Sequence, residues 1–577
     1  MSVRSLLLYI VAANALFAEQ QTTAIVGGTL INTDGSGLLE NSVILLNGEI
    51  IDQVGTVETV SVPGGSQVID ASGKYIIPGL IDAHVHFFQS GGLYTRPDAI
   101  DLRKHVPYVD GELAEIKERL PDTFRRYIRS GITSVVDVGG PLWNFDVRTA
   151  AQKDSMAPTV AVAGPLISTY QPDALTTDDP PIIKVNSIRE AKKLVRQQAQ
   201  FAPDLIKIWY IANHPERGTP PAEETYPIIE ATTRESHKLG YRVAVHATEL
   251  ETARLAIKAG ADVLVHGVKD KIVDQAFIDM LIDNEVIYTP TIAVVPGYAE
   301  TYSQMGKFLP EEFEIANPYT MGTLFDLRHL PKEDIPERRR IALQNAEPVV
   351  ANSTALENLR ILSEAGALIA VGTDAGNIGT LPGPAIFEEF RLMAKAGISP
   401  ENILRSATQV SAKVMGQEAK RGTVEPGKMA DLVILNSNPL DNISNTGDIQ
   451  GVVKAGRYFA VDEIIPFSPV DLVQQQLNAY NAGDIKAFVS TYSTNIEIFT
   501  HPDSLIMEGH DAIFSRYGPY FDENPRLHVE ILDRMTFGDY VIDQEHVTGR
   551  ANGLEKKATA IYQIEGKLIR RVWFLDN

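Results

Sequence analysis

The chain contains no cysteine among its 577 residues. This absence excludes disulfide bonds, thiolate metal ligands, thiol nucleophiles and a lipid anchor attached to cysteine. Any metal ion that the chain binds must therefore be held by nitrogen and oxygen ligands, a set that suits zinc, with manganese or iron as alternatives.

Basic residues are also scarce relative to acidic ones. The chain has 52 Lys and Arg against 74 Asp and Glu, which gives a formal net charge of −22. Such an excess of negative charge disfavours nucleic acid and anionic lipid as partners. No stretch shows the basic pattern, interleaved with aromatic residues, that nucleic-acid binding requires. The expected partner is a small-molecule substrate.

Long hydrophobic runs are missing as well, so no membrane span is predicted. The apolar run at residues 6–13 is too short to cross a bilayer, but it follows Arg4 and precedes a small-residue cleavage site ending at Ala18. This order is typical of an export signal over residues 1–18, with an ordinary N-terminal helix as the alternative. We therefore predict a periplasmic or secreted protein.

A chain of this length exceeds a single hydrophobic core. Short apolar strands broken by turns occupy residues 22–77 and again 420–462, and we expect them to combine into one β-sandwich built from both flanks. Between them, residues 78–419 alternate strand and helix, which predicts an α/β fold of the (β/α)8 TIM-barrel type. The candidate strands are residues 80–82, 133–138, 159–163, 205–209, 243–246, 263–266, 287–290 and 368–372.

One connection in this central region, residues 294–360, is unusually long. A connection of this length usually carries helices of its own and often covers a site, so we interpret it as a lid. After residue 467 the pattern changes to two helices, then a strand, a helix and four further strands. Residues 468–577 are therefore predicted to form a separate α+β domain.

Metal-ligand residue types gather at the predicted carboxyl ends of the central strands. His84 and His86 follow the first strand, His246 and His266 end the fifth and sixth, and Asp374 follows the eighth. Residues two apart on an extended segment project to the same side, so His84 and His86 can reach one ion. Because a barrel collects these strand ends at one face, all five side chains are expected to meet there.

Lys207 is a cation within the apolar strand 205–209. A buried lysine without a partner is costly. One explanation is a buried salt bridge, with Asp374 as the candidate partner. The other is that CO2 has carboxylated the amine, which converts it into an anionic ligand able to bridge two metal ions.

Together these motifs resemble the metal-dependent amidohydrolase superfamily, in its imidazolonepropionase and prolidase-like branch. The resemblance rests on His84-x-His86 after Pro-Gly-Leu-Ile-Asp, on the remaining ligand residues, and on Ala430-Asp431-Leu432-Val433 in the returning flank. It implies a binuclear site with two divalent ions, with Zn2+ as the favoured metal. One ion would be held by His84, His86 and Asp374, the other by His246 and His266, with carboxylated Lys207 bridging them and Asp374 acting as the catalytic proton carrier.

The resemblance implies hydrolysis of an amide or cyclic amide bond, in a peptide, N-acyl amino acid or similar compound, by metal-activated hydroxide. The same hydroxide could attack an ester, lactone or phosphotriester, so these substrates stay open. Relatives that cleave Xaa-Pro dipeptides often carry a histidine after the third strand, and residues 164–170 contain none. Tyr170, Tyr210 and Tyr288 are candidate substrate contacts, although core packing would explain each equally well.

Residues 468–577 resemble a SnoaL-like domain, the cone-shaped fold of nuclear transport factor 2. The resemblance rests on Ala479-Tyr480-Asn481-Ala482-Gly483-Asp484 and on Arg571-Val572-Trp573-Phe574. It implies either a ligand cavity or homo-oligomerisation through the sheet, and it leaves open a non-catalytic protein that captures a ligand in the cone. The candidate acid or base groups, which could equally form the polar face of a sheet, are His501, Asp503, His528, Asp543 and Glu545.

Overall fold

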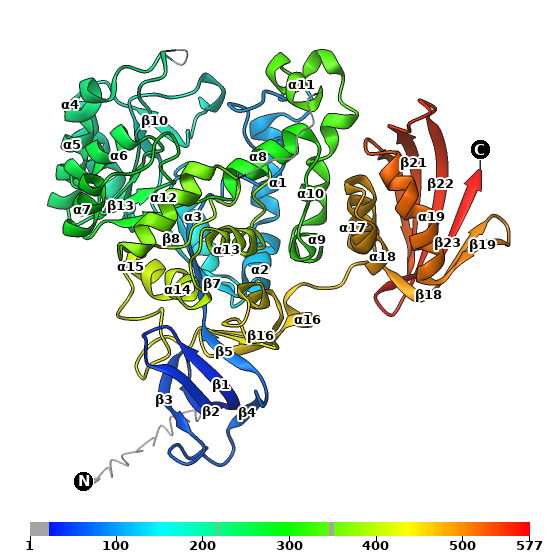
Figure 1. The fold of residues 1–577 in the computed structure, drawn as a ribbon, viewed down its shortest axis with the longest axis horizontal. Coiled ribbons are helices and arrows are strands. Elements are labelled where there is room, and N and C mark those ends of the chain that lie inside the picture. Colours follow the sequence, from blue (N-terminus) through cyan, green and yellow to red (C-terminus); the bar gives the residue numbers. More distant parts are fainter. Residues whose placement is uncertain (1–21, 216–217, 345–350, 577) are drawn as a thin grey trace, which may run out of the picture.

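The computed structural model describes residues 22–215, 218–344 and 351–576. The predicted export signal, residues 1–18, lies outside this part of the chain. Figure 1 shows three regions: a sheet of strands from both flanks at the bottom, a central region of strands and helices, and a C-terminal unit at the right. Among the described helices, none has both the length and the apolar character that a membrane crossing requires.

The two flanks of the central region share one hydrogen-bonded sheet of eight strands. Strand β5 of the first flank pairs antiparallel with β15 of the second, with Ile77 opposite Val433. Ile25, Ile44 and Leu432 are among the buried side chains that pack on this sheet. Its division into a two-layered sandwich stays a prediction. The strands are β1 (Thr23–Asn32), β2 (Gly37–Asn47), β3 (Ile50–Thr56), β4 (Gln67–Asp70), β5 (Tyr75–Pro78), β15 (Leu432–Leu435), β16 (Ile449–Lys454) and β17 (Arg457–Ala460).

The central region contains two parallel sheets, in the orders β6-β7-β8 and β10-β9-β11-β12-β13-β14. Seven of the predicted strands are confirmed within a few residues, and two short strands, β9 and β10, are additional. The strands are β6 (Leu80–Val85), β7 (Ile132–Asp137), β8 (Thr159–Val162), β9 (Leu166–Ser168), β10 (Ile182–Lys184), β11 (Ile206–Trp209), β12 (Val243–His246), β13 (Val263–Val265) and β14 (Ile287–Thr289).

The eighth predicted strand, residues 368–372, forms an isolated bridge between Ile369 and Tyr288 rather than a regular strand. On one side, Tyr288 N donates to Leu368 O at 2.8 Å and Ala370 N donates to Tyr288 O at 3.0 Å. On the other, Ala83 N donates to Val371 O at 2.9 Å. This segment therefore joins β14 to β6 and brings the ends of the two sheets together.

Helices follow most of the central strands, as the alternation predicts. In Figure 1, α4 to α7 lie on the outside of β10 to β13. Buried side chains of strand and helix, such as Val245 on β12 and Phe277 on α7, belong to one apolar core. The helices are α1 (Leu113–Glu118), α2 (Leu120–Arg129), α3 (Asn144–Ala151), α4 (Ile188–Gln198), α5 (Ala222–Lys238), α6 (Leu250–Lys258), α7 (Gln275–Asp283), α12 (Ser353–Glu364), α13 (Ala385–Lys395), α14 (Pro400–Arg405), α15 (Ser411–Val414) and α16 (Val461–Ile464).

The long connection after β14 carries helices of its own, as expected. They are α8 (Val294–Ser303), α9 (Pro310–Ile315), α10 (Pro318–Thr323) and α11 (Glu337–Gln344). We refer to residues 294–344 as the covering segment.

The C-terminal unit is an α+β domain with a six-stranded sheet in the order β19-β18-β23-β22-β21-β20. Gly483 ends the first helix in a left-handed conformation, and the Asp484 carboxylate accepts from Lys486 N and Ala487 N at the start of the second. Both caps agree with the sequence. The elements are α17 (Pro469–Ala482), α18 (Ile485–Ser490), β18 (Tyr492–Thr500), β19 (Ser504–Glu508), α19 (Gly509–Glu523), β20 (His528–Phe537), β21 (Tyr540–Thr548), β22 (Lys556–Glu565) and β23 (Leu568–Asp576).

The C-terminal unit packs on the covering segment, with α17 beside α9 and α10 (Figure 1). Asn478 Nδ2 donates to Pro318 O at 2.7 Å. The Arg328 guanidinium, in the covering segment, donates to Asn481 O at 2.5 Å and Leu527 O at 2.7 Å. These hydrogen bonds fix the covering segment to the C-terminal unit.

Candidate metal centre and active site

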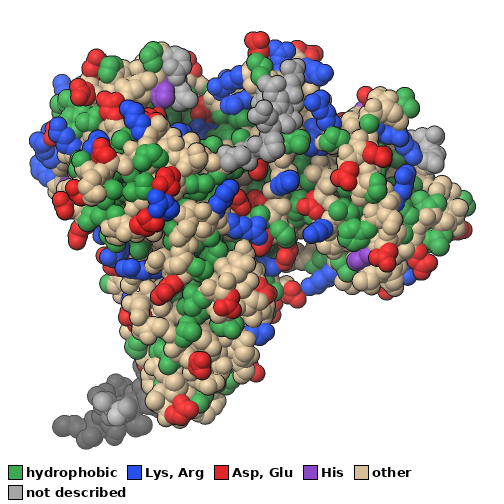
Figure 2. All heavy atoms as spheres, in the orientation of Figure 1, with side chains coloured by type: hydrophobic (Ala, Val, Ile, Leu, Met, Phe, Trp, Pro, Cys, Tyr) green, Lys and Arg blue, Asp and Glu red, His purple; other side chains and the backbone are tan. Residues whose placement is uncertain are grey.

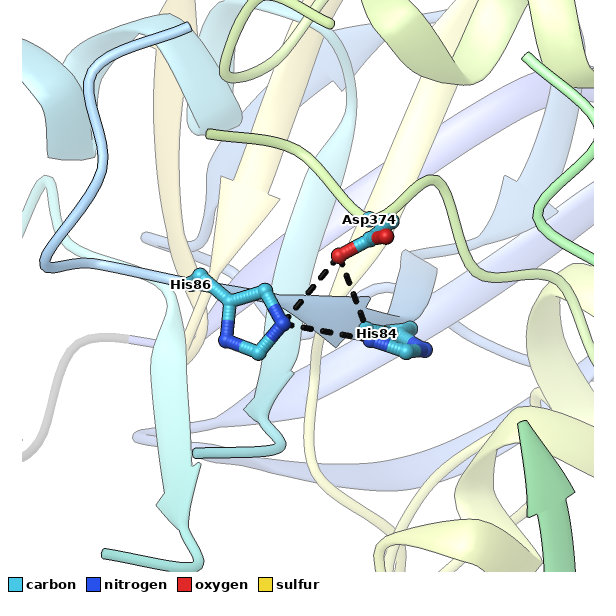
Figure 3. Close-up of side chains that lie close together, drawn as sticks. All are labelled: His84, His86 and Asp374. Carbon is cyan, nitrogen blue, oxygen red and sulfur yellow. Dashed lines mark hydrogen bonds and ion pairs between the residues drawn. The ribbon is translucent and has the colours of Figure 1, made fainter. Parts of the chain in front are cut away.

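His84, His86 and Asp374 converge at the carboxyl end of β6 (Figure 3). Asp374 Oδ1 lies 3.3 Å from His84 Nε2 and 3.1 Å from His86 Nε2. The two Nε2 atoms are 3.3 Å apart. All three residues are buried. The structure therefore brings Asp374 to a pair of histidines that lie almost three hundred positions earlier in the chain.

This cluster fits a metal ion by its chemistry and its spacing. Donor atoms about 2.0–2.1 Å from one tetrahedral ion lie about 3.3 Å from each other, which matches the three distances. Asp374 Oδ1 is buried and makes no aligned hydrogen bond. A buried oxygen of this kind needs a partner, and a cation at the centre of the cluster would supply it.

The backbone around Asp374 allows the close approach. Asp374 has φ 59°, a left-handed conformation that residues other than glycine rarely adopt. A Cβ atom on Gly372 would lie 2.6 Å from His84 Cβ, and one on Gly376 would lie 2.6 Å from His86 O. Glycine at both positions is therefore required for the Asp374 turn to sit against the histidines.

His246 and His266 lie next to this cluster. The His266 ring centroid is 4.3 Å from that of His246 and 4.8 Å from that of His84. His266 Nδ1 is 2.8 Å from Thr291 Oγ1 and 3.8 Å from Asp374 Oδ2. Like Asp374, His266 has a left-handed backbone, with φ 79°. Strained residues of this kind concentrate at functional sites.

Lys207 reaches the same cavity from β11, and its side chain is only 1% exposed. Its Nζ has no hydrogen-bond partner, and none of the ion pairs among the described residues includes it. Burial lowers the pKa of Lys207 to about 7, against the opposing attraction of Asp374. The buried salt bridge that the sequence left open is therefore not formed, and the amine still needs a partner.

The protonation states agree with metal ligation. Burial lowers the pKa of His84 to about 3 and holds the pKa values of His246 and His266 well below their ordinary range. Burial alone would raise the pKa of Asp374, but the surrounding imidazoles, His84 foremost, hold it well below its usual range. Neutral imidazoles beside an ionised carboxylate are the forms that bind a cation.

A second set of contacts, which the sequence did not predict, orients His86. Its Nδ1 donates to Gly139 O at 2.6 Å, which leaves Nε2 free to face Asp374. Gly139 N in turn donates to the buried carboxylate of Asp137 at 3.1 Å. A hydrogen bond at one ring nitrogen fixes the tautomer and raises the basicity of the other.

Asp82 is another functional residue that the sequence analysis passed over. Its buried carboxylate accepts from His84 N at 3.2 Å and from Thr373 N at 3.0 Å. Burial raises the pKa of Asp82 to about 7. The sequence contains a signal for the role of Asp82. This acidic residue interrupts the apolar run Leu80-Ile81-Asp82-Ala83, two positions before His84.

The cavity in front of these residues has a volume of about 600 Å³. Its lining includes His86, Lys207, His246, His266 and Asp374, so five of the six predicted ligand positions open into one space. The sixth, His84, is fully buried behind them.

The three predicted tyrosine contacts differ in placement. Tyr170 lines the cavity, and its contact with substrate stays a prediction. Tyr210 and Tyr288 are fully buried and are not among the described lining residues. The Tyr210 hydroxyl donates to Ala222 O at 2.6 Å, and the Tyr288 hydroxyl accepts from Val268 N at 2.8 Å. Both tyrosines therefore have packing roles.

A polar network that the sequence did not predict connects the cavity wall to Asp374. Tyr298 donates from its hydroxyl to Asn377 Oδ1 at 2.7 Å, and Arg96 donates to the same oxygen at 2.5 Å. Asn377 Nδ2 donates to the Asp374 carbonyl at 3.2 Å. All four side chains line the cavity.

The C-terminal unit encloses its own cavity of about 360 Å³. Glu545 lines it and accepts a hydrogen bond of 2.9 Å from the Tyr562 hydroxyl. Burial raises the pKa of Glu545 to about 7. His501 and Asp503 lie in an exposed turn between β18 and β19, away from the described lining of this cavity.

The other two candidate groups of this unit have structural partners. Asp543 is buried in a two-pronged ion pair with Arg534, with both oxygen–nitrogen distances at 2.7 Å. His528 lies at the contact with the covering segment, where its Nε2 is 2.9 Å from His329 Nδ1. Neither lines the cavity of the C-terminal unit among the described residues.

A model of the amidohydrolase family matches residues 75–458, a range that contains every residue of the cluster. The chain belongs to the amidohydrolase family. A model of the SnoaL-like domain matches residues 473–572, so this amidohydrolase carries a SnoaL-like domain at its C-terminal end.

Curated relatives match most of the amidohydrolase part. Enamidase from Eubacterium barkeri is 22% identical over 441 residues, which is 74% of this chain and 89% of the relative. Imidazolonepropionase from Pseudomonas savastanoi is 23% identical over 415 residues, 69% of this chain and 88% of the relative. A solved structure of a Xaa-Pro dipeptidase is 25% identical with a TM-score of 0.59, and the match covers 76% of this chain and 100% of that one.

This amidohydrolase is accordingly an enzyme, a hydrolase that acts on carbon–nitrogen bonds. The non-catalytic alternative, a barrel without activity beside a ligand-binding cone, is thereby set aside. Both resemblances stated from the sequence are confirmed.

Proposed function

We propose that this amidohydrolase is a binuclear metal-dependent enzyme that cleaves an amide or cyclic amide bond in a small molecule. The observation that carries the proposal is the convergence of five ligand-type side chains on one cavity, with His84 directly behind them. His84, His86 and Asp374 would hold one divalent ion, and His246 and His266 the other. Zinc suits this set of imidazole and carboxylate donors.

Lys207, carboxylated by CO2, would bridge the two ions. Its amine is buried and unpartnered beside Asp374 and the histidines. Carboxylation replaces a buried cation with an anion between two cations, and this removes the cost of burying an unpaired charge.

We further propose that the eight central strand segments close into a (β/α)8 barrel. The hydrogen bonds of residues 368–375 to β14 and β6 support closure on one side. On the other side, Asp204 N, just before β11, donates to Val162 O of β8 at 2.9 Å. Active sites of such barrels lie at the carboxyl ends of the strands, where the cluster is found.

In the mechanism, the bound ions would supply hydroxide near neutral pH and polarise the substrate carbonyl. Asp374 accepts the proton of the attacking nucleophile at its carboxylate and returns it to the leaving nitrogen. His86, held through Nδ1 by Gly139 O, keeps its ring aligned with Asp374. The walls of the cavity position the substrate and limit the access of bulk water.

Metal analysis of the full chain tests the proposal. We expect about two zinc ions per chain after reconstitution with zinc and bicarbonate, and loss of amide hydrolysis after chelation that zinc restores. Absence of bound metal after this treatment would refute the binuclear site. A panel of dipeptides, N-acyl amino acids, cyclic amides, lactones, esters and phosphotriesters would separate the amide assignment from the alternatives.

Two further proposals concern the ends of the chain. The pattern of residues 1–18 supports export to the periplasm or beyond, and the N-terminal sequence of the mature protein would test it. The match of the C-terminal unit to the SnoaL-like domain supports a homo-oligomer through this unit, which light scattering of the full chain would test. In both cases the catalytic proposal is unaffected by the outcome.

A further inference from the structure

Helix α11 brings two arginines to the wall of the catalytic cavity. Arg338 and Arg339 both line it, and each donates to the carbonyl of Ala99 at 3.0 Å. In Figure 2, Lys and Arg side chains (blue) gather around α11 at the top of the view. Such a local excess of positive charge is unexpected in a chain whose formal net charge is −22.

Neither arginine has an acidic partner among the ion pairs of the described residues. This distinguishes them from Arg96, another arginine of the cavity, which forms an ion pair of 2.6 Å with Asp98. A paired arginine has its charge and its donors satisfied, whereas an arginine that meets only one carbonyl retains most of both. Arg338 and Arg339 are therefore free to bind an anion in the cavity.

The packing of Arg339 against Tyr302 fixes the orientation of its guanidinium group. Its guanidinium carbon lies 3.6 Å from the centroid of the Tyr302 ring. Stacking on an aromatic face holds the planar group while leaving its N–H edges accessible. Its Nε is buried and has no hydrogen-bond partner, so a donor on this edge is still unsatisfied.

A chain of contacts links this arginine to the metal cluster. The Tyr302 ring lies 5.8 Å from the ring of Tyr298, and Tyr298 reaches Asp374 through Asn377. The arginines thus line the same cavity as Asp374, and Arg339 stacks on Tyr302 at the start of these contacts.

We propose that Arg338 and Arg339 form a carboxylate-binding subsite, and that the natural substrate is an amide with a free carboxylate, such as an N-acyl amino acid or a dipeptide. This inference rests on the proposed amide hydrolysis at the metal centre. A planar guanidinium binds a carboxylate through two parallel hydrogen bonds, and two adjacent arginines also complement its charge. The metal centre would then act on the amide bond while the arginines hold the other end of the substrate.

A pair of probes that differ only in the carboxylate tests the subsite. N-acetyl-L-phenylalanine carries it, and N-acetyl-2-phenylethylamine lacks it. We expect the zinc-loaded full chain to bind the first about 10- to 100-fold more tightly in calorimetry, the range for charge-assisted hydrogen bonds. The double variant Arg338→Gln/Arg339→Gln should lose this preference, while affinity for the neutral probe stays unchanged.

Arg340→Gln is the matched control, because Arg340 lies on the same helix, is exposed and is not among the described lining residues. It should keep the preference. Arg338→Lys/Arg339→Lys, which keeps the charge but not the paired geometry, should keep part of it. Equal affinity of the wild-type chain for both probes, or binding of neither, would overturn the inference, as would an equal loss in Arg340→Gln.

Turnover distinguishes this inference from the proposed function. Cleavage of neutral and anionic amides without a preference would leave amide hydrolysis standing and remove the carboxylate subsite. Failure of the zinc-loaded chain to cleave any amide in the panel would refute the proposed function, and in that case calorimetry still measures the binding preference, because neither probe is turned over.

Discussion

Thr373 donates two hydrogen bonds to the carboxylate of Asp82, from its backbone nitrogen at 3.0 Å and from Oγ1 at 2.6 Å. The same carboxylate accepts from His84 N at 3.2 Å. Asp82 therefore connects the residue before Asp374 to the residue that begins the His-x-His pair. It positions His84 and Asp374 from behind and is not among the described residues that line the cavity.

Replacement of Asp82 with alanine should remove the acceptor of three buried hydrogen bonds. Each unsatisfied buried donor costs about 1–3 kcal/mol, so we expect a loss of about 3 kcal/mol or more in the free energy of unfolding. The zinc content of the purified chain should fall with it. Asp52→Ala, at an exposed carboxylate of β3, is the control and should leave both unchanged. Full zinc content in Asp82→Ala would contradict the positioning role.

Replacement of Lys207 with alanine should abolish the bridging ligand. We expect the variant to bind less than the wild-type complement of zinc and to lose amide hydrolysis by about 100-fold or more, because both ions lose a ligand. Metal analysis and kcat/KM check this. Lys269→Ala, at another lysine of the cavity, should retain the metal. Wild-type metal content and activity in Lys207→Ala would refute the carboxylated-lysine assignment.

Replacement of Arg328 with alanine should loosen the C-terminal unit. Its guanidinium donates to Asn481 O and Leu527 O of that unit and to Gln304 O of the covering segment at 2.9 Å. Loss of these charge-assisted hydrogen bonds should cost about 2 kcal/mol or more. We expect a lower melting temperature and faster proteolysis between α16 and α17. Arg189→Ala, at an exposed arginine of α4, should show neither effect.

The stability of the C-terminal unit should depend on the protonation of Glu545. Burial raises its pKa to about 7 in the folded chain from an ordinary value of 4.5. The folded state therefore binds more protons than the unfolded state between these values, and stability falls as the pH rises from about 4.5 to 7. A shift of this size corresponds to about 3 kcal/mol.

Glu545→Gln should remove this dependence, because the amide does not titrate. Melting temperatures of both proteins at pH 5 and pH 8 check the prediction. The decrease between the two pH values should be smaller in the variant, and an equal decrease would show that Glu545 does not contribute. Other buried acids also titrate in this range, for example Glu300 with a pKa of about 7, so only the difference between the two proteins is diagnostic.

The sequence predicts that His84, His86 and Asp374 lie close together, because each follows a recognisable strand segment. His84 and His246 follow apolar strand segments, and the parallel alternation implies that these ends meet. His266 and Asp374 also share a backbone conformation that the sequence does not reveal. Left-handed conformations at His266 and Asp374 are imposed by tertiary packing, and few residues other than glycine adopt them.

Other parts of the site depend on long-range placement that local patterns do not encode. Arg338 and Arg339 reach the cavity only because the covering segment folds back over it, and nothing in Arg338-Arg339-Arg340 indicates which arginines face inward. Tyr210 and Tyr288 lie near strand ends, where a residue that contacts substrate would also lie. Their burial is decided by neighbouring helices and loops, which explains why the sequence left packing and binding equally open.

The pairing of β5 with β15 has a consequence for biosynthesis. Ile77 emerges from the ribosome long before Val433, its partner across the sheet. The edge of β5 that pairs with β15 stays unpaired while the whole catalytic region is synthesised. Unpaired strand edges promote aggregation. If the chain crosses a membrane before it folds, this delay is an advantage, because the sheet cannot lock the chain into a compact form until β15, at residues 432–435 of 577, has been made.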